Sequence, residues 1–201
     1  MERKYRQMNT WNLIMKSYLT KHEKTTYDNL FIGKKIPWFL GRISVKDAVR
    51  NYIESISGTI HHPGLLTIEN DSKGKPLVTQ DLTAHPLHIS IAHKKDIAVG
   101  MCNNTPVGID LELIKERPAS FTREMLNPTE VTLFQAQGAN AELLTRMWVA
   151  KETYGKQLGL GLQGHPKQYH ITAIEGNRLR IKDTWINTIK HNNTYIIGWT
   201  L

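Results

Sequence analysis

Apolar and polar positions recur along the first part of the chain at helical spacing. Over residues 11–32 the apolar side chains fall broadly on one helical face, and from Trp38 to Ile56 they do so more strongly. Residues 33–37 contain a glycine and a proline and predict an interruption between the two helices. Gly58 and the His-Pro-Gly run at 62–64 predict the end of the second helix.

The remainder of the chain mixes short apolar runs with two further helical segments. The runs predict strands over Leu65–Glu69, His88–Ala92, Ile97–Cys102, Val107–Glu112, Tyr169–Ile174, Leu179–Lys182 and Tyr195–Thr200. Asn127 followed by Pro128 is typical of an N-cap and the first residue of a helix. A turn at 138–140 separates that helix from another over residues 141–157. The pattern therefore predicts the α+β fold class.

Two of the predicted strands resemble each other, and the chain begins without a strand. Residues 96–100 read Asp-Ile-Ala-Val-Gly, and residues 194–198 read Thr-Tyr-Ile-Ile-Gly. A similarity over five residues, here called the echo segments, is weak evidence of an internal repeat by itself. The first ten residues show no strand pattern.

Composition narrows the class of protein without selecting a function. A chain of 201 residues fits one domain or two small halves packed as one unit. No signal-peptide core opens the chain, and no stretch approaches the ~18 apolar residues of a membrane span. The single Cys102 excludes an internal disulfide and favours a cytoplasmic protein. The net charge of +8 indicates an anionic partner, either nucleic acid or a polyanionic small molecule together with an acidic protein.

The candidate chemistry lies in two acidic motifs about forty residues apart. Asp110 and Glu112 alternate along a predicted strand and so share one of its faces. Glu152 and Lys156 lie one turn apart on a predicted helix. Three carboxylates and a lysine that converge would suit Mg²⁺ and substrate phosphates. The ordinary alternatives are a solvated strand end and a surface salt bridge.

The order and the residue patterns of these two motifs resemble those of a known protein family. Val107–Glu112 matches G-[IV]-D-x-E, and Trp148–Lys156 matches W-x-x-K-E-[AS]-x-x-K except for Thr153. Both are hallmarks of the 4′-phosphopantetheinyl transferase superfamily, and the likeness runs from about Leu30 to the C-terminus. The longer, surfactin-synthetase-activating members consist of two similar α/β halves related by a pseudo-twofold axis, and they usually open with a strand that this chain lacks. Here the resemblance implies a half at 1–105 that contacts coenzyme A and a half at 106–201 that carries the metal and catalytic motifs.

The resemblance also implies which residues contact coenzyme A. They are Lys34, Lys35, Arg42, Gly74, Lys75, Pro76, His93, Asp110 and Lys156. In the family, the basic segment and the histidine lie near the 3′-phosphate, and the Gly-Lys-Pro loop lies beside the adenine. Around His93 this chain departs from the usual Ser-His-Ser pattern, because Ala92 precedes it and Lys94 and Lys95 follow. The resemblance implies that the lost hydroxyl would weaken one phosphate contact and that the two lysines would supply charge in its place.

The activity implied is that of a 4′-phosphopantetheinyl transferase of the holo-acyl-carrier-protein synthase type. Asp110, Glu112 and Glu152 would hold Mg²⁺, or alternatively Mn²⁺, while Glu152 and Lys156 act as catalytic groups. The substrates would be coenzyme A and an acidic apo carrier protein, and the enzyme would be a cytoplasmic monomer with no nucleic acid or membrane partner. One alternative is a non-catalytic module of the same fold that binds coenzyme A or a carrier protein. A basic nucleic-acid-binding domain rests on the net charge alone.

Overall fold

The computed structural model describes the backbone of residues 2–200 and the side chains of residues 10–200. The first part of the chain forms α1 (Glu2–Tyr18), α2 (Lys21–Asn29), α3 (Ile32–Ser57), the 3₁₀ turn η1 (Pro63–Leu65), β1 (Ile68–Asn70), β2 (Pro76–Val78), β3 (His88–Lys94) and β4 (Ile97–Asn103). The second part forms β5 (Ile109–Leu113), α4 (Ala119–Met125), α5 (Pro128–Ala136), α6 (Ala141–Gln157), the 3₁₀ turn η2 (Pro166–Gln168), β6 (Ile171–Glu175), β7 (Arg178–Ile181), β8 (Thr184–His191) and β9 (Tyr195–Thr200). The mixed α+β class is thus confirmed.

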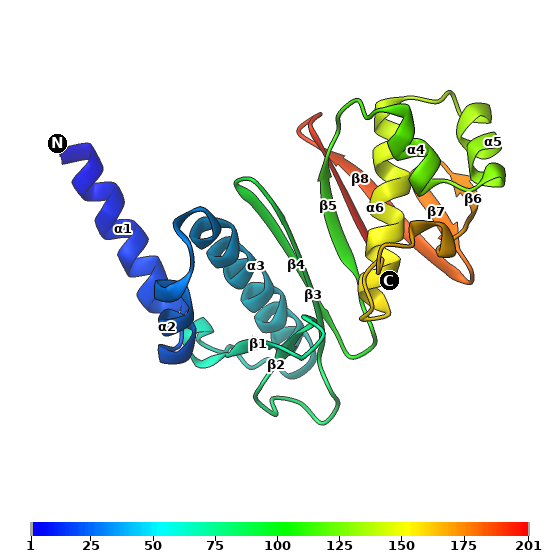
Figure 1. Cartoon of the computed structure of the whole chain (residues 1–201). Coiled ribbons are helices and arrows are strands. Elements are labelled where there is room, and N and C mark those ends of the chain that lie inside the picture. Colours follow the sequence, from blue (N-terminus) through cyan, green and yellow to red (C-terminus); the bar gives the residue numbers. More distant parts are fainter. Residues whose placement is uncertain (1, 201) are drawn as a thin grey trace.

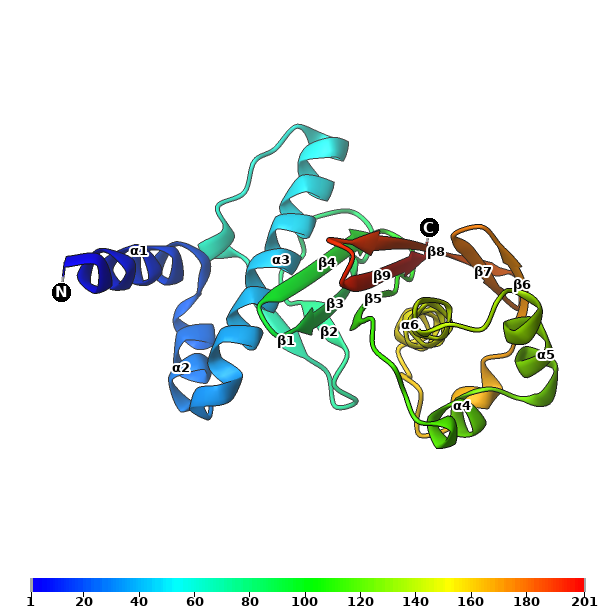
Figure 2. The ribbon, with the colours of Figure 1, turned by 90° about the horizontal axis from the view of Figure 1, so that it is seen from above.

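Each part of the chain packs its sheet against one long helix. In the second part, an antiparallel sheet in the order β5-β9-β8-β7-β6 curves around α6, which Figure 2 views end-on. Met147 and Ala150 of α6 are fully buried against Leu179 and Ile186 of that sheet. In the first part, the β3–β4 hairpin lies along α3 (Figure 1), where Val45 and Ile89 belong to one apolar cluster. The hydrophobic effect therefore fixes both helices on their sheets.

The two parts meet where the hairpin lies beside the edge strand β5. Figure 1 shows β3 and β4 between α3 and β5. Ala92 of β3, Leu111 of β5 and Tyr195 of β9 are buried in a common cluster. The echo segments 96–100 and 194–198 fall mainly in β4 and β9, the strands that lie against α3 and α6 respectively. The joint between the parts therefore brings β3, β5 and α6 close together.

The expected interruption at residues 33–37 is wrong. These residues form the first turns of α3, with Pro37 inside the helix, and the breaks fall at residues 19–20 and 30–31 instead. A proline near the start of a helix removes a single backbone hydrogen bond. Complete burial of Phe39, which packs edge-on against Trp11 and Tyr27, offsets that loss.

The strands and helices otherwise follow the sequence pattern with a few omissions. The helix over residues 141–157 and the capped start of α5 at Asn127 and Pro128 are confirmed. The strands β2 and β8 and the helix α4 were missed, and the run at Leu65–Glu69 is reduced to β1 preceded by a 3₁₀ turn. Residues 2–10 lie in α1, so the predicted lack of a strand there is confirmed. Within the described residues, no helix is long and apolar enough to cross a membrane.

A buried glutamate ties three elements together in the first part of the chain. Glu23 belongs to the capping box that begins α2, in which it pairs with the N-cap residue Thr20. Its carboxylate accepts hydrogen bonds from Lys46 Nζ of α3 at 2.5 Å and from the backbone N–H of Ile68 in β1 at 3.1 Å. Both charged side chains are almost completely buried, so each one compensates the other.

The second part of the chain repeats this arrangement with different residues. Glu130 belongs to the capping box that begins α5 at Asn127. It accepts from Lys151 Nζ of α6 at 2.9 Å and from the backbone N–H of Ile171 in β6 at 2.8 Å. A short capped helix, the long helix and a strand are therefore joined through one buried ion pair in each part. The same contacts explain why Lys151 points away from its neighbour Glu152.

Candidate functional site

The two acidic motifs meet at the joint between β5 and α6. Asp110 lies opposite Gly198 of β9, on the sheet face that α6 covers. A Cβ atom on Gly108 would lie 2.0 Å from the backbone oxygen of Thr153, so only glycine allows the strand to approach the helix this closely. As a result, Lys156 Nζ of α6 reaches Asp110 Oδ1 at 2.8 Å. The expected convergence of these two residues is thus observed.

Asp110 is the most enclosed of the three candidate carboxylates. Only 7% of the residue is exposed, and burial raises the pKa of its carboxyl although Lys156 acts in the opposite direction. Its second oxygen, Oδ2, has no hydrogen-bond partner among the described residues. Lys156 also donates to the backbone oxygen of Ile91 in β3 at 3.2 Å. The lysine therefore connects α6 to both β5 and β3, and one buried carboxylate oxygen remains available to a ligand.

Glu112 lies on the same face of β5 but is held by two cations. Lys94 Nζ, at the end of β3, donates to Glu112 Oε1 at 2.9 Å. Arg117 Nη2 lies 3.6 Å from Glu112 Oε2, and its guanidinium stacks 4.4 Å from the ring centre of Phe121. These two contacts were not anticipated from the sequence, because neither cation stands at helical or strand spacing from Glu112.

Glu152 lies on the wall of a hollow of about 650 Å³ beside α6. Phe121, Trp148 and Leu162 supply apolar lining, and the rings of Phe121 and Trp148 are 5.2 Å apart. Burial and, to a lesser degree, the negative charge of Asp110 raise the pKa of Glu152 to about 7, with Lys156 and Lys94 opposing the rise. The carboxyl can therefore take or release a proton near neutral pH.

The chemistry of these side chains fits a hard divalent cation, although their present positions do not yet form its site. Asp110, Glu112 and Glu152 offer carboxylate oxygens, the ligands that Mg²⁺ prefers, and Asp110 Oδ2 is unpartnered. Among the described residues, however, no three metal-ligating side chains are gathered around one point. Two of the carboxylates are instead paired with lysines at 2.8 and 2.9 Å. Asp110 still offers Oδ2 to a metal, whereas Glu112 Oε1 would have to be released by Lys94 first.

The expected coenzyme A loop lies next to Lys156. Gly74, Lys75 and Pro76 line a hollow of about 230 Å³ together with Lys156 and the glycine-rich turn at 159–161. The side chain of Asp71 accepts hydrogen bonds from the backbone N–H groups of Lys73 and Lys75 and so fixes the loop. Ser90 also lines this hollow and was not anticipated as a site residue. Its spacing of three residues from His93 puts the two side chains on opposite faces of the strand, so the pattern around His93 did not point to Ser90.

Of the other residues predicted to contact coenzyme A, some have exposed side chains and some already contact other parts of the protein. His93 is exposed overall, but one edge of its ring lies against α3 at Gly41. Partial desolvation of the ring and the charges of Lys156 and Lys94 lower its pKa. Lys34 is exposed at the start of α3. Lys35 Nζ donates to the backbone oxygen of Asp28 at 3.0 Å. The ammonium group of Lys35 is thus partly satisfied by a contact within the helical region.

Arg42 is committed to the interface between α2 and α3. Its Nε lies 3.9 Å from Glu23 Oε1, and its guanidinium lies 4.7 Å from the ring centre of Trp38. The side chain is only 9% exposed. The structure therefore does not bring Arg42 to the hollow that the Gly-Lys-Pro loop lines.

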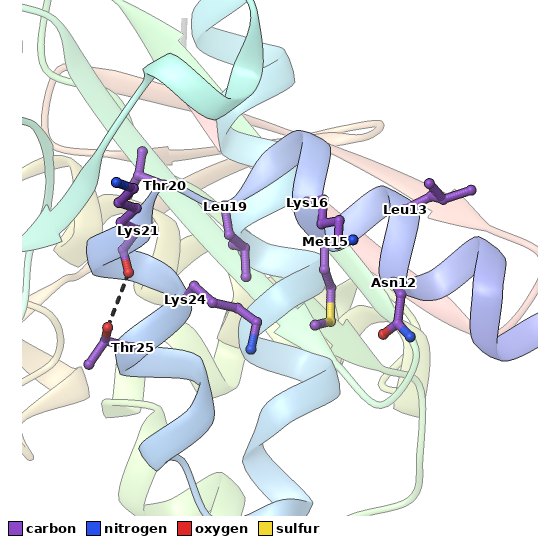
Figure 3. Close-up of a pocket in the computed structure, with 9 residues that line it drawn as sticks. All are labelled: Asn12, Leu13, Met15, Lys16, Leu19, Thr20, Lys21, Lys24 and Thr25. Atoms are coloured by element: carbon purple, nitrogen blue, oxygen red, sulfur yellow. Dashed lines mark hydrogen bonds between the residues drawn. The ribbon is translucent and has the colours of Figure 1, made fainter.

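A further hollow lies far from this chemistry in the fold. It measures about 750 Å³ and opens between α1 and α2, where Leu13, Met15 and Leu19 lie among several lysines (Figure 3). The residues that line it include no carboxylate and none of the predicted site residues. Its size alone gives it no catalytic role, because the convergent titratable groups lie at β5 and α6.

Comparison with known proteins shows to which protein family this chain belongs. The family model of the 4′-phosphopantetheinyl transferase superfamily matches residues 106–199. A holo-[acyl-carrier-protein] synthase from Geobacillus is 31% identical over 81 residues, which are 40% of this chain and 68% of that protein. The chain belongs to the 4′-phosphopantetheinyl transferase superfamily, and the sequence resemblance is confirmed.

Two longer relatives match a larger part of this chain. The 4′-phosphopantetheinyl transferase gsp of Aneurinibacillus migulanus is 28% identical over 133 residues, or 62% of this chain and 54% of that protein. The 4′-phosphopantetheinyl transferase HetI of a Nostoc strain is 25% identical over 129 residues, or 61% of this chain and 54% of that protein. The matched segment thus spans about half the length of each of these relatives.

Proposed function

We propose that this protein transfers the 4′-phosphopantetheine group of coenzyme A to a serine of an apo carrier protein. The observation that carries the proposal is the 2.8 Å contact of Lys156 with Asp110, at a hollow that Lys156 lines together with a loop of the family's Gly-Lys-Pro sequence. Glu152 lies one turn before Lys156 on the same helix. The names of the relatives, which include a holo-[acyl-carrier-protein] synthase, support the same substrate class. The net charge of +8 suits both the polyanionic coenzyme and an acidic carrier.

The transfer itself needs a base and positive charge at the diphosphate. The serine oxygen attacks the β-phosphorus of coenzyme A and forms a new oxygen–phosphorus bond. The bond from that phosphorus to the bridging oxygen breaks, and adenosine 3′,5′-bisphosphate leaves with the electron pair. Glu152 takes the serine proton directly or through a water molecule. Lys156 places its ammonium group against the negative charge on the phosphates.

The proposed metal ligands are Asp110, Glu112 and Glu152. A bound Mg²⁺ or Mn²⁺ would supply additional positive charge to the diphosphate oxygens. The unpartnered Oδ2 of Asp110 supports this assignment, since a buried carboxylate oxygen normally has a partner. Glu112 would contribute once its contact with Lys94 is released.

We propose that the coenzyme lies between the two parts of the chain. The 3′-phosphate would lie at His93 and Lys34, and the adenine at Gly74, Lys75 and Pro76. In this proposal residues 1–105 and 106–201 form two halves related by a pseudo-twofold axis. The buried pairs Glu23–Lys46 and Glu130–Lys151 support that relationship, because each joins equivalent elements of its half.

The experiment is a transfer reaction with coenzyme A, Mg²⁺ and a panel of apo carrier proteins, read by mass spectrometry. A carrier that gains one 4′-phosphopantetheine group supports the proposal. Coenzyme A binding by calorimetry is measured in parallel. Binding of coenzyme A with no transfer to any carrier would favour the non-catalytic binding module, and absence of both would contradict the proposed use of this site.

A further inference from the structure

We propose that Lys94 is an exchangeable counter-ion of Glu112 that competes with the divalent cation for this carboxylate. The ammonium group balances Glu112 in the metal-free protein and leaves it when the metal binds. Lys94 therefore sets the affinity of the site for metal. This inference rests on the proposed function, since it concerns the same site.

The geometry places Lys94 directly on the candidate ligand. Its Nζ lies 2.9 Å from Glu112 Oε1, a normal charge-assisted hydrogen bond. The backbone of Lys94 is held as the last residue of β3, where it pairs with Ile97 across the hairpin. The following residue, Lys95, has a φ of 53° and turns the chain back. The lysine is therefore anchored at its base and held by one ion pair at its tip.

The charges around Glu112 explain why the ammonium and a divalent cation exclude each other. Lys94 also acts on Glu152, where its charge opposes the rise in pKa caused by burial and by the neighbouring carboxylates. A cation bound at Glu112 would thus sit beside an ammonium group that already lies 2.9 Å from an oxygen of that ligand. Coulomb repulsion between them, and competition for the same oxygen, both oppose metal binding while Lys94 stays in place.

Of the two cations on Glu112, Lys94 is the one free to leave. Its side chain is 39% exposed, and its flexible stem can carry the ammonium group into water. The side chain of Arg117 is only 11% exposed, and its guanidinium is stacked on Phe121. Arg117 Nη2 makes no hydrogen bond among the described residues, so it acts on Glu112 by charge alone and from a buried position. Lys94 is therefore the cation that leaves Glu112 when a metal binds.

The test measures Mn²⁺ binding to the full chain without coenzyme A, by electron paramagnetic resonance of free Mn²⁺. Lys94→Gln removes the charge and keeps a polar side chain that is one atom shorter. Its Kd for Mn²⁺ is expected to be about five- to tenfold lower than that of the wild type, since an opposing ion pair and a neighbouring like charge are both lost. Lys94→Arg keeps the charge and should bind within about twofold of wild type. Lys115→Gln removes an exposed lysine three residues after Glu112 and serves as the control for net charge.

The outcomes separate this inference from the proposed function. Tightening of at least twofold in Lys94→Gln, absent in Lys94→Arg and Lys115→Gln, supports the exchange. A Kd less than twofold lower than wild type, an equal change in Lys115→Gln, or failure of every protein to bind Mn²⁺ overturns it. The transfer reaction is run on the wild type alongside. Carrier modification with an unchanged Kd in Lys94→Gln refutes only the role of Lys94, whereas absence of carrier modification refutes the proposed function.

Discussion

Replacing Glu152 with glutamine should stabilise the protein at alkaline pH while abolishing transfer. The folded structure raises the pKa of this carboxyl from 4.5 to about 7. The proton is therefore bound more tightly in the folded than in the unfolded protein, and its stabilising contribution is fully present below pH 4.5. It is lost as the pH rises through about 7. Above that pH the wild type carries a poorly solvated charge that the neutral glutamine lacks.

The size of this effect follows from the shift in pKa. The difference between 4.5 and about 7 corresponds to at most ~3.4 kcal/mol. The group is only partly buried, so solvent screening reduces the expected value to ~1–2 kcal/mol. For a chain of this length, that corresponds to a rise in Tm of about 3–6 °C for Glu152→Gln relative to wild type at pH 8. At pH 5 the two proteins should differ much less, because the wild-type carboxyl is then protonated in the fold.

The assay is urea unfolding of both proteins at pH 5 and pH 8 in the presence of a chelator, because a bound cation would lower the pKa of the wild-type carboxyl. Glu124→Gln is the matched control, since Glu124 is exposed on the same hollow. A stability difference between Glu152→Gln and wild type that is equal at pH 5 and pH 8 would refute the reasoning about the buried charge. Transfer by Glu152→Gln at the wild-type rate would refute the assignment of the base.

Three further predictions address metal, substrate and fold. Asp110→Ala should lose most transfer activity with its fold intact by circular dichroism, and near-normal transfer would exclude it as a required ligand. His93→Ala should raise the KM for coenzyme A more than it lowers kcat, with a smaller effect on dephospho-coenzyme A; equal effects on the two substrates would make the histidine structural. Glu130→Gln should cost ~3–5 kcal/mol in urea unfolding, because Lys151 is left buried without a counter-charge. Glu175→Gln, which breaks an exposed ion pair, should cost less than ~1 kcal/mol, and similar costs for the two would contradict the importance of burial.

The parts of the fold that the sequence predicted well are those governed by local signals. The helix α6 has a side-chain cap at Asn140, and α5 begins with Asn127 and Pro128, so both starts could be assigned from neighbouring residues. The strand β5 and the helix α6 carry the family motifs, and their side chains meet as expected at Asp110 and Lys156. Spacing within each element was enough to find them.

The parts that could not be predicted depend on contacts between distant residues. Pro37 was expected to stop a helix, but the burial of Phe39 holds α3 together through it. Arg42 was assigned to coenzyme A, whereas the buried carboxylate of Glu23 draws it into the interface between α2 and α3. Lys94 was noted only as a departure beside His93, because the register that brings it to Glu112 exists only in the folded chain. Long-range electrostatics of this kind leaves no periodic signal.

We propose that the residues where β5 meets α6 form a phosphopantetheine-transfer site rather than a surface salt bridge. The most direct measurement compares wild type, Lys156→Met and Lys190→Met in a single-turnover reaction with coenzyme A, Mg²⁺ and a responsive apo carrier. Lys190 of β8 forms an ion pair of similar length, 2.9 Å, with Glu142 in the first turn of α6, is more exposed than Lys156, and is the matched control. We expect wild type and Lys190→Met to convert the carrier at similar rates, and Lys156→Met to be slowed by at least ~100-fold. Conversion by Lys156→Met within a few-fold of wild type would contradict it.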